Sequence, residues 1–311
     1  MTSSSPTDAT ATLVLPARAQ LGECPLWSVA DARLYWEDID GRAVHRFDPG
    51  TGLDEWRALP GRPGSMALTP VAGRLLVAME GGLGFLDFDD GTWSDWIELE
   101  DKGRGNRMND GRTDPAGRFW VGTMFDPSAD ERASGSLYRV EPDGTATVKR
   151  TGIGVPNGLA FSPDGRTMYW ADTHQDTVWA YDYDVDTGEA TDERVFLDFA
   201  SLPGRPDGAC VDAEGAYWIA CVYGSTVLRV LPDGTVDRRI TIPTLKPTMP
   251  AFGGPTLSTL FVTSIGGGGS HAANPDDPDA GGIFAIEVDA RGRPDPVFTG
   301  GPGGGPAGEP H

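Results

Sequence analysis

Four short segments of the 311-residue chain begin with a residue whose side-chain oxygen can bind a metal ion. These residues are Glu23, Asn109, Asn157 and Asp207. Carboxylate and amide oxygens are hard donors, which suit Ca²⁺, Mg²⁺ or Mn²⁺. Because a site with few protein ligands leaves coordination positions open, Zn²⁺ and Fe²⁺ also remain possible. Such a site forms only if the fold brings these side chains together.

A pattern of two short apolar strands, separated by a polar break and followed by a Gly-containing turn, occurs six times. The first strands are expected at 33–38, 74–79, 118–123, 167–172, 216–221 and 259–264, and their partners at 43–49, 84–90, 136–142, 177–183, 226–232 and 282–288. A repeat of this length, rich in β-branched and aromatic residues, is typical of four-stranded blades. No segment shows a sustained helical period. The sequence therefore predicts an all-β fold, a six-bladed β-propeller of four-stranded antiparallel blades. The regular spacing disfavours a β-sandwich.

The propeller is predicted to span residues 13–298 as one domain. Residues 1–12 are rich in Ser and Thr without apolar periodicity, and residues 299–311 are almost entirely Gly, Pro and Ala. Both ends are predicted to be disordered tails.

Ahead of each first strand lies a segment that should form the innermost strand of its blade. The leading residues of these segments are Glu23, Ser65, Asn109, Asn157, Asp207 and Ala251. Asn-Gly and Asp-Gly pairs often mark turns, which is the alternative interpretation of Asn157 and Asp207. Four carboxylate or amide side chains at one repeat position are hard to ascribe to turns, and two carboxylates facing one axis repel each other unless a cation or a proton neutralises them. The pattern therefore favours a metal site. The neighbouring Cys24 and Cys210 are expected to point away from it.

The overall charge bears on the class of partner. The chain has 46 acidic and 25 basic residues, for a formal net charge of −21. So acidic a surface repels phosphate backbones and anionic lipids, which argues against nucleic-acid and membrane partners. Three cysteines are too few for a disulfide framework, and no secretory signal or membrane-spanning segment is evident. We expect a cytoplasmic protein that is a monomer or a weak homo-oligomer.

Several motifs, in matching order, also resemble one known family. They are Gly22-Glu23-Cys24-Pro25-Leu26-Trp27, Arg107-Met108-Asn109-Asp110-Gly111, Pro156-Asn157-Gly158-Leu159-Ala160 and Pro206-Asp207-Gly208. With these motifs the chain resembles the senescence marker protein-30/gluconolactonase family, which includes regucalcin, from about Arg18 to about Asp289.

The resemblance implies a metal-dependent hydrolase that opens aldonolactones, such as gluconolactone or a pentonolactone. It implies one divalent cation, with Ca²⁺ favoured over Mg²⁺, Mn²⁺, Zn²⁺ and Fe²⁺, held by Glu23, Asn157 and Asp207. It also implies that Arg107 and Asn109 line the substrate pocket. A family acidic residue that reaches the substrate falls near Asp126-Pro127, and either Asp126 or Glu131 could take its place.

Asp207 is the candidate general base, and hydroxide on the metal is the alternative. Arg107 could donate hydrogen bonds to sugar hydroxyls or to the new carboxylate, unless it is merely an exposed charge at a strand end. A non-catalytic calcium-binding propeller, an interaction platform, and a phosphotriester or aryl-ester hydrolase are the other functions considered. His45, His174 and His271 are expected to be structural or solvated, and the glycine run 266–269 to form a flexible loop at the rim of the channel.

Overall fold

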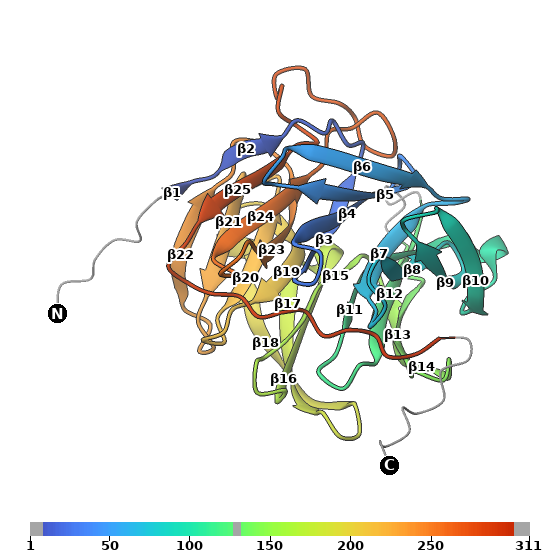
Figure 1. Cartoon of the computed structure of the whole chain (residues 1–311). Coiled ribbons are helices and arrows are strands. Elements are labelled where there is room, and N and C mark those ends of the chain that lie inside the picture. The colour runs from blue at the N-terminus through green and yellow to red at the C-terminus, as the bar shows by residue number, and fades with distance from the viewer. Residues whose placement is uncertain (1–8, 127–131, 302–311) are drawn as a thin grey trace, which may run out of the picture.

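The computed structural model describes residues 9–126 and 132–301, and these residues form the predicted propeller (Figure 1). Within these ranges the only helical segments are three single 3₁₀ turns, η1 (Lys102–Arg104), η2 (Thr173–Gln175) and η3 (Phe199–Ser201). Six sheets of antiparallel strands surround one axis, and the innermost strands of neighbouring blades contact each other around a closed ring. The prediction of fold class is confirmed.

Five blades are each built from four strands that follow one another in the chain, with the innermost strand first. Blade 1 contains β3 (Gly22–Ser28), β4 (Arg33–Asp38), β5 (Ala43–Asp48) and β6 (Leu53–Ala58). Blade 2 contains β7 (Pro63–Leu68), β8 (Arg74–Met79), β9 (Gly82–Asp87) and β10 (Thr92–Glu98). Blade 3 contains β11 (Asn106–Thr113), β12 (Phe119–Phe125), β13 (Gly135–Val140) and β14 (Ala146–Ile153). Blade 4 contains β15 (Pro156–Phe161), β16 (Thr167–Asp172), β17 (Thr177–Asp184) and β18 (Glu189–Asp198). Blade 5 contains β19 (Arg205–Val211), β20 (Tyr217–Val222), β21 (Thr226–Val230) and β22 (Val236–Thr241).

Blade 6 is completed by the opposite end of the chain. It consists of β23 (Pro247–Gly253), β24 (Thr259–Ser264), β25 (Ile283–Glu287) and the N-terminal β2 (Thr12–Leu15), which pairs antiparallel with β25. Ahead of it, β1 (Ala9–Thr10) pairs parallel with β22 of blade 5. Figure 1 shows these blue strands beside the orange ones. The predicted disorder of residues 9–12 is therefore wrong, because their backbone groups pair with the two neighbouring blades.

The core lies between the blades, where each sheet packs its face against the next. The six residues at the third position of the predicted first strands are all buried: Tyr35, Leu76, Trp120, Tyr169, Trp218 and Phe261. Burying large aromatic side chains is strongly favourable, since each removes 150–250 Å² from water. All three cysteines are buried and unpaired. Cys24 and Cys210 pack in apolar clusters between blades.

The segment 290–301 runs across one end of the propeller (Figure 1, red). Asp295 in this segment forms a 2.6 Å ion pair with Arg112, whose side chain also donates to the carbonyl oxygens of Leu159 (3.1 Å) and Ala209 (2.9 Å). Phe298 is fully buried, and its backbone N–H donates to the carbonyl oxygen of Leu68. We call this the arginine end of the axis, because Arg112 joins blades 3, 4 and 5 to the C-terminal segment there.

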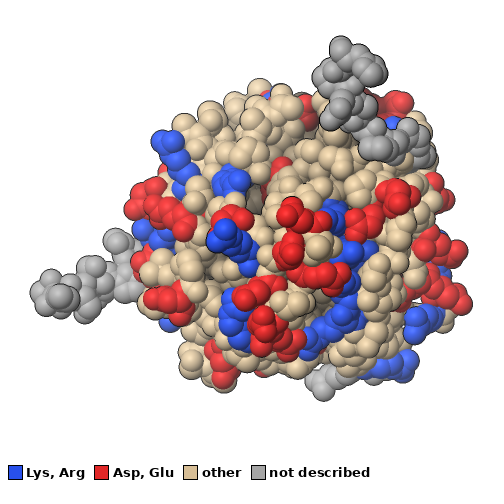
Figure 2. Space-filling model, turned by 90° about the horizontal axis from the view of Figure 1, so that it is seen from below, with Lys and Arg blue, Asp and Glu red and all other residues tan. Residues whose placement is uncertain are grey.

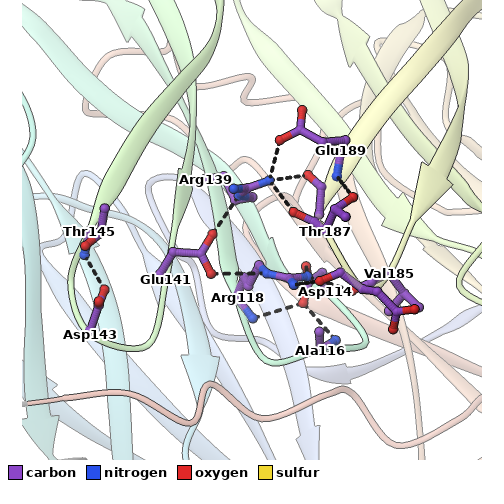
Figure 3. Close-up of polar contacts among 12 residues, drawn as sticks. Asp114, Ala116, Arg118, Arg139, Glu141, Asp143, Thr145, Val185, Thr187 and Glu189 are labelled. Carbon is purple, nitrogen blue, oxygen red and sulfur yellow. Dashed lines mark hydrogen bonds and ion pairs between the residues drawn. The ribbon is translucent and has the colours of Figure 1, made fainter.

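Ion pairs join neighbouring blades at the periphery. Within blade 3, Arg118 pairs with Asp114 and Glu141 and Arg139 pairs with Glu141, and Arg139 also pairs with Glu189 of blade 4 (Figure 3). Figure 2 shows basic side chains interspersed among acidic ones over one side of the molecule. A single exposed pair contributes little, but a network holds two blades in register.

No helix in the described part of the chain is both long and apolar enough to span a membrane.

Candidate functional site

Every innermost strand is irregular at the same place. In each of the six, the pairing with the second strand shifts by an extra residue, between 23 and 26, 63 and 65, 108 and 111, 157 and 160, 206 and 209, and 247 and 250. Such β-bulges redirect side chains. Asn157 and Asp207 thus lie inside strands β15 and β19, not in turns.

Gly158 shows why a glycine follows Asn157 at the bulge. Its φ is +64°, and a Cβ on it would lie 2.4 Å from the hydroxyl oxygen of Tyr217, which donates to the carbonyl oxygen of Gly158. Any larger residue would be strained by both the backbone conformation and the contact. The Asn-Gly pair here serves close packing between β15 and blade 5.

Cross-strand pairing identifies which residues are equivalent. Glu23 pairs with Glu37, Ser65 with Ala78 and Asn157 with Ala171, each two residues beyond the aligned aromatic or Leu. Ala251 pairs with the aligned residue Phe261 itself and lines a small cavity with Arg112. The predicted place of Ala251 in the ring is therefore wrong.

Thr248 occupies the equivalent place in blade 6, within the bulge of β23 and beside Thr263. Its hydroxyl lies 2.6 Å from the carbonyl oxygen of Gly22 and 2.8 Å from the hydroxyl of Thr263. The error arose because nine residues separate the aligned Phe261 from its cross-strand partner in blade 6, whereas seven or eight separate the corresponding partners in the other blades.

One pocket, of about 540 Å³, is lined by the predicted ring residues that have a carboxyl or amide side chain. Its lining includes Glu23, Arg107, Asn109, Asn157 and Asp207. They come from β3, β11, β15 and β19 of four different blades. We call this the carboxylate end of the axis.

Burial raises the pKa of the two carboxyl groups at this end. Desolvation, assisted by the nearby Asp110, raises the pKa of Glu23 to about 8, although the Cys24 backbone N–H donates to Glu23 Oε2 at 2.9 Å. Desolvation and the proximity of Glu23 and Asp110 raise the pKa of Asp207 well above its usual value. Neither Glu23 nor Asp207 forms an ion pair within 4 Å with a residue in the described ranges. Removing two carboxylates from water without a counter-charge is costly.

The amide groups at the carboxylate end are held by hydrogen bonds. Arg107 Nη1 donates to Asn109 Oδ1 at 2.7 Å, and Asn109 Nδ2 donates to Asn157 Oδ1 at 3.1 Å and to the Pro156 carbonyl at 2.8 Å. Asn157 Nδ2 donates to the hydroxyl of Thr173 at 2.8 Å. Both NH₂ groups are therefore turned toward protein acceptors. The Oδ1 atom of Asn157 keeps one lone pair for a further partner.

These residues fit a hard divalent cation. Glu23, Asp207 and Asn157 provide two carboxyl groups and one amide oxygen in one pocket, and a cation would supply the counter-charge that the two carboxyl groups lack. Among the described residues no three His, Cys, Asp or Glu side chains gather as a metal cluster.

Of Asp126 and Glu131, the acidic residues predicted to reach the substrate, the structure describes only Asp126, which does not line this pocket. Asp126 forms a 2.5 Å ion pair with Arg62, which also pairs with Glu80 at 2.7 Å, and Asp126 is not part of the pocket lining. Glu131 lies outside the described residues. The side chain of Asp126 therefore pairs with Arg62 beside the pocket and does not line it.

Sequence reasoning missed several other residues of the pocket. His174, Arg205, Lys246 and His271 all contribute to its lining. The two histidines follow a strand and a glycine run, so nothing in the local sequence distinguishes them from solvated residues. The prediction that 266–269 lies at the rim is consistent with Ser270 and His271, which line the pocket.

Glu37 was also missed. It lies on β4 directly opposite Glu23, is fully buried, and neither of its carboxyl oxygens has a hydrogen-bond partner among the described residues. The corresponding residues in blades 2 and 4 are Ala78 and Ala171. Desolvation and the proximity of Glu23 raise the pKa of Glu37 well above its usual value. The carboxylate end thus has a further buried carboxyl group, that of Glu37, beside Glu23.

The chain matches known proteins over most of its length. Residues 21–266 match the model of the "SMP-30/Gluconolactonase/LRE-like region". A 6-deoxy-6-sulfogluconolactonase of Pseudomonas putida is 40% identical over 281 residues, which cover 90% of this chain and 95% of the relative. A pentonolactonase of Haloferax volcanii is 38% identical and covers 92% of this chain and 97% of its own. The crystal structure of a calcium-binding protein, regucalcin, from Agrobacterium tumefaciens superimposes with a TM-score of 0.86 at 32% identity, covering 94% of this chain and 97% of that one. The chain therefore belongs to the SMP-30/gluconolactonase/LRE-like family.

Proposed function

We propose that this protein is a metal-dependent hydrolase that opens sugar lactones to the corresponding aldonic acids. The observation that carries the proposal is the pocket in which an amide oxygen and two buried carboxyl groups, without an ion-pair partner in the described ranges, adjoin Arg107 and Asn109. Relatives named as lactonases, at 40% and 38% identity over nearly their whole length, support the reaction class. Their names differ in the sugar, so the substrate has to be inferred from the pocket.

In the proposed reaction the oxygen of water adds to the lactone carbonyl carbon and the ring C–O bond breaks. The former ring oxygen takes up a proton and becomes a hydroxyl group, and the new carboxylic acid ionises. Glu23, Asn157 and Asp207 would hold the cation, with Ca²⁺ favoured because all three donors are oxygens. When bound, the cation would polarise the carbonyl group and make water more acidic.

The chain's own groups have separate roles in this proposal. Asp207, whose pKa burial raises, would accept a proton from the attacking water and return it to the leaving ring oxygen. Arg107 is nine-tenths buried and holds Asn109 in place, so both can direct donors at sugar hydroxyls or at the nascent carboxylate. The 540 Å³ pocket has room for a five- or six-membered lactone and water.

The test is a pH-indicator assay over a panel of five- and six-membered aldonolactones. Chelator-treated protein is measured alone and after addition of Ca²⁺, Mg²⁺, Mn²⁺, Zn²⁺ or Fe²⁺ singly. We expect at least one metal to restore hydrolysis well above the rate in buffer. Hydrolysis of no lactone with any metal would contradict the proposal. Calorimetric Ca²⁺ binding without turnover would instead identify a non-catalytic calcium-binding propeller.

A further inference from the structure

The pocket at the carboxylate end has an unusual charge for this protein. Three of its lining residues are cationic, Arg107, Arg205 and Lys246, and two are carboxylic acids, Glu23 and Asp207. The whole chain, by contrast, has a formal charge of −21. The cavity of about 430 Å³ beside blade 2 follows the general balance, since Glu80, Asp95 and Glu98 line it against the single cation Lys102.

Lys246 is the most informative of the three cations. It is one of only three lysines in the chain, and it is partly buried. Its ammonium group donates to the carbonyl oxygen of Ala272 at 3.2 Å and lies 5.6 Å from the ring centre of Tyr223. Within the described ranges no carboxylate lies within 4 Å of it. An anionic ligand in the pocket could therefore form a charge-assisted hydrogen bond with this ammonium group.

The cations stand on different sides of the axis. Arg107 belongs to β11 of blade 3, whereas Lys246 directly precedes β23 of blade 6, and the contacts between innermost strands place these two blades opposite each other. Arg205, at the start of β19 in blade 5, lies on the Lys246 side and donates to Asp176 at 2.8 Å. Burial, together with the positive charges of Lys246 and Arg107, lowers the pKa of His271. This pocket residue is therefore a neutral hydrogen-bonding group.

On the Lys246 side, Asp176 pairs with Arg205 and Asp277 accepts hydrogen bonds from Thr244 and Leu245, but no carboxylate in the described ranges lies within 4 Å of Lys246 itself. Asp126 pairs with Arg62 at 2.5 Å, and Asp40 lies 3.8 Å from the same guanidinium group, on the side of blades 1 to 3. Glu23 and Asp207 would be neutralised by the divalent cation of the proposed function. Lys246 is then a positive charge of the pocket that takes no part in the proposed cation site.

We infer that the preferred substrate is a sugar lactone that carries an anionic group at the end remote from its carbonyl, recognised by Lys246 with Arg205 beside it. This inference rests on the proposed function and names the substrate class of the same pocket. A carboxylate, a sulfonate and a phosphate share the required chemistry, since each presents oxygens with full negative charge to an ammonium group. The bonds formed and broken are those of the reaction proposed above, because the anionic group takes no part in them.

The experiment compares lactones of one ring size that differ only at the terminal carbon, as hydroxyl, carboxylate, sulfonate or phosphate. With the metal-loaded wild-type protein at low salt, we expect kcat/KM for at least one anionic lactone to exceed that of the hydroxyl compound about tenfold or more. The most favoured of the three identifies the anion. Raising the salt concentration should reduce the preference, since screening weakens a partly exposed charge pair.

Two variants of Lys246 and a control variant distinguish binding of the anionic group from a merely structural role of this lysine. Lys246→Met should lower kcat/KM for the favoured anionic lactone about tenfold, chiefly through KM, and leave the hydroxyl lactone within about twofold. Lys246→Arg should keep most of the preference. The control, Lys149→Met, removes a lysine that pairs with Glu189 on the surface and should change neither value.

Two outcomes would overturn the inference while leaving the proposed function intact. One is equal kcat/KM for all four lactones in the wild type. The other is a Lys246→Met variant that slows neutral and anionic lactones alike. Failure of the proposed function is recognised separately, because then none of the four compounds is hydrolysed with any metal.

Discussion

The two ends of the propeller axis are built by the same six strands but satisfy their polar groups in opposite ways. At the arginine end, Arg112 donates to two carbonyl groups and pairs with Asp295 of the C-terminal segment. At the carboxylate end, Glu23 and Asp207 are buried without an ion-pair partner in the described ranges, and Glu37 behind them has no hydrogen bond there. The comparison indicates that one end serves stability and that the other is left open for a ligand at a cost in stability.

The largest expected effect is loss of activity at the carboxylate end. We expect Asp207→Asn to lower kcat/KM for the preferred lactone by roughly 10²–10⁴-fold, the usual contribution of a general base, and to weaken calorimetric metal binding. The control Glu98→Gln changes an exposed carboxyl group on β10, outside this pocket, and should leave both unchanged. Wild-type activity in Asp207→Asn would exclude Asp207 from both roles.

The next effect belongs to the arginine end. Arg112→Met removes the partner of Asp295 and the donor to Leu159 and Ala209. Breaking a buried ion pair on one side costs about 3–5 kcal/mol, so urea unfolding should show a loss of that size. The variant should still bind metal where it is folded. A stability equal to the wild type would show that Arg112 is not needed to close this end.

Removing the metal should lower the free energy of unfolding, because the buried carboxyl groups then lose their counter-charge. A ligand at 100 times its Kd stabilises the folded state by about 2.7 kcal/mol, and chelation should remove that amount. In the metal-free protein the folded-state pKa of Glu23, about 8, lies above its ordinary 4.5. The folded state therefore retains a proton that the unfolded chain has lost, so this group's contribution to stability falls as pH rises from about 4.5 to 8.

The same shift predicts how metal binding depends on pH. Below about pH 8 the cation must displace the proton of Glu23, so the rise in Tm on metal addition should be larger at pH 8 than at pH 6. Glu23→Gln should weaken binding and flatten this dependence. A metal-induced rise in Tm that is equal at both pH values in the wild type would contradict the assignment of Glu23 as a ligand.

The smallest expected effect concerns Glu37. Because its pKa is raised in the folded protein and no partner is present among the described residues, Glu37→Gln should stabilise the metal-free protein by about 1–3 kcal/mol near pH 8 and by less at pH 6. Urea unfolding at the two pH values measures the difference. Destabilisation at both values would mean that the carboxyl group has a stabilising partner at this end.

The sequence was sufficient for the fold because each blade repeats one pattern, and the aligned aromatic or Leu residues mark the interfaces between blades. It was also sufficient to predict that Glu23, Asn109, Asn157 and Asp207 line one pocket, since these polar residues recur at one position of that repeat. In blade 6, where more residues separate the aligned Phe261 from its cross-strand partner than in the other blades, counting residues placed Ala251 in the ring in place of Thr248. Register depends on the bulge and the turn, which residue spacing alone does not reveal.

Other features depend on contacts between distant parts of the chain. Lys246 and His271 reach the pocket from loops, whose path is set by tertiary contacts. Glu37 belongs to a strand of ordinary pattern, Arg33–Asp38, where a charged residue near the end resembles the usual polar edge. β1 and β2 are too short and polar to be recognised locally, because their partners, β22 and β25, are more than 200 residues away.

The pairing of β2 with β25 also sets a limit on the order of folding. The hydroxyl of Thr12 donates to the carbonyl oxygen of Ala285 across a sequence separation of 273 residues. During synthesis β2 has no partner until β25 has been made, whereas blades 1 to 5 can form from local hairpins. Contacts of such long range form late and slowly. Closure of the ring is therefore expected to be the slow phase of refolding, and a chain without residues 9–15 should form hairpins but leave blade 6 with a free edge.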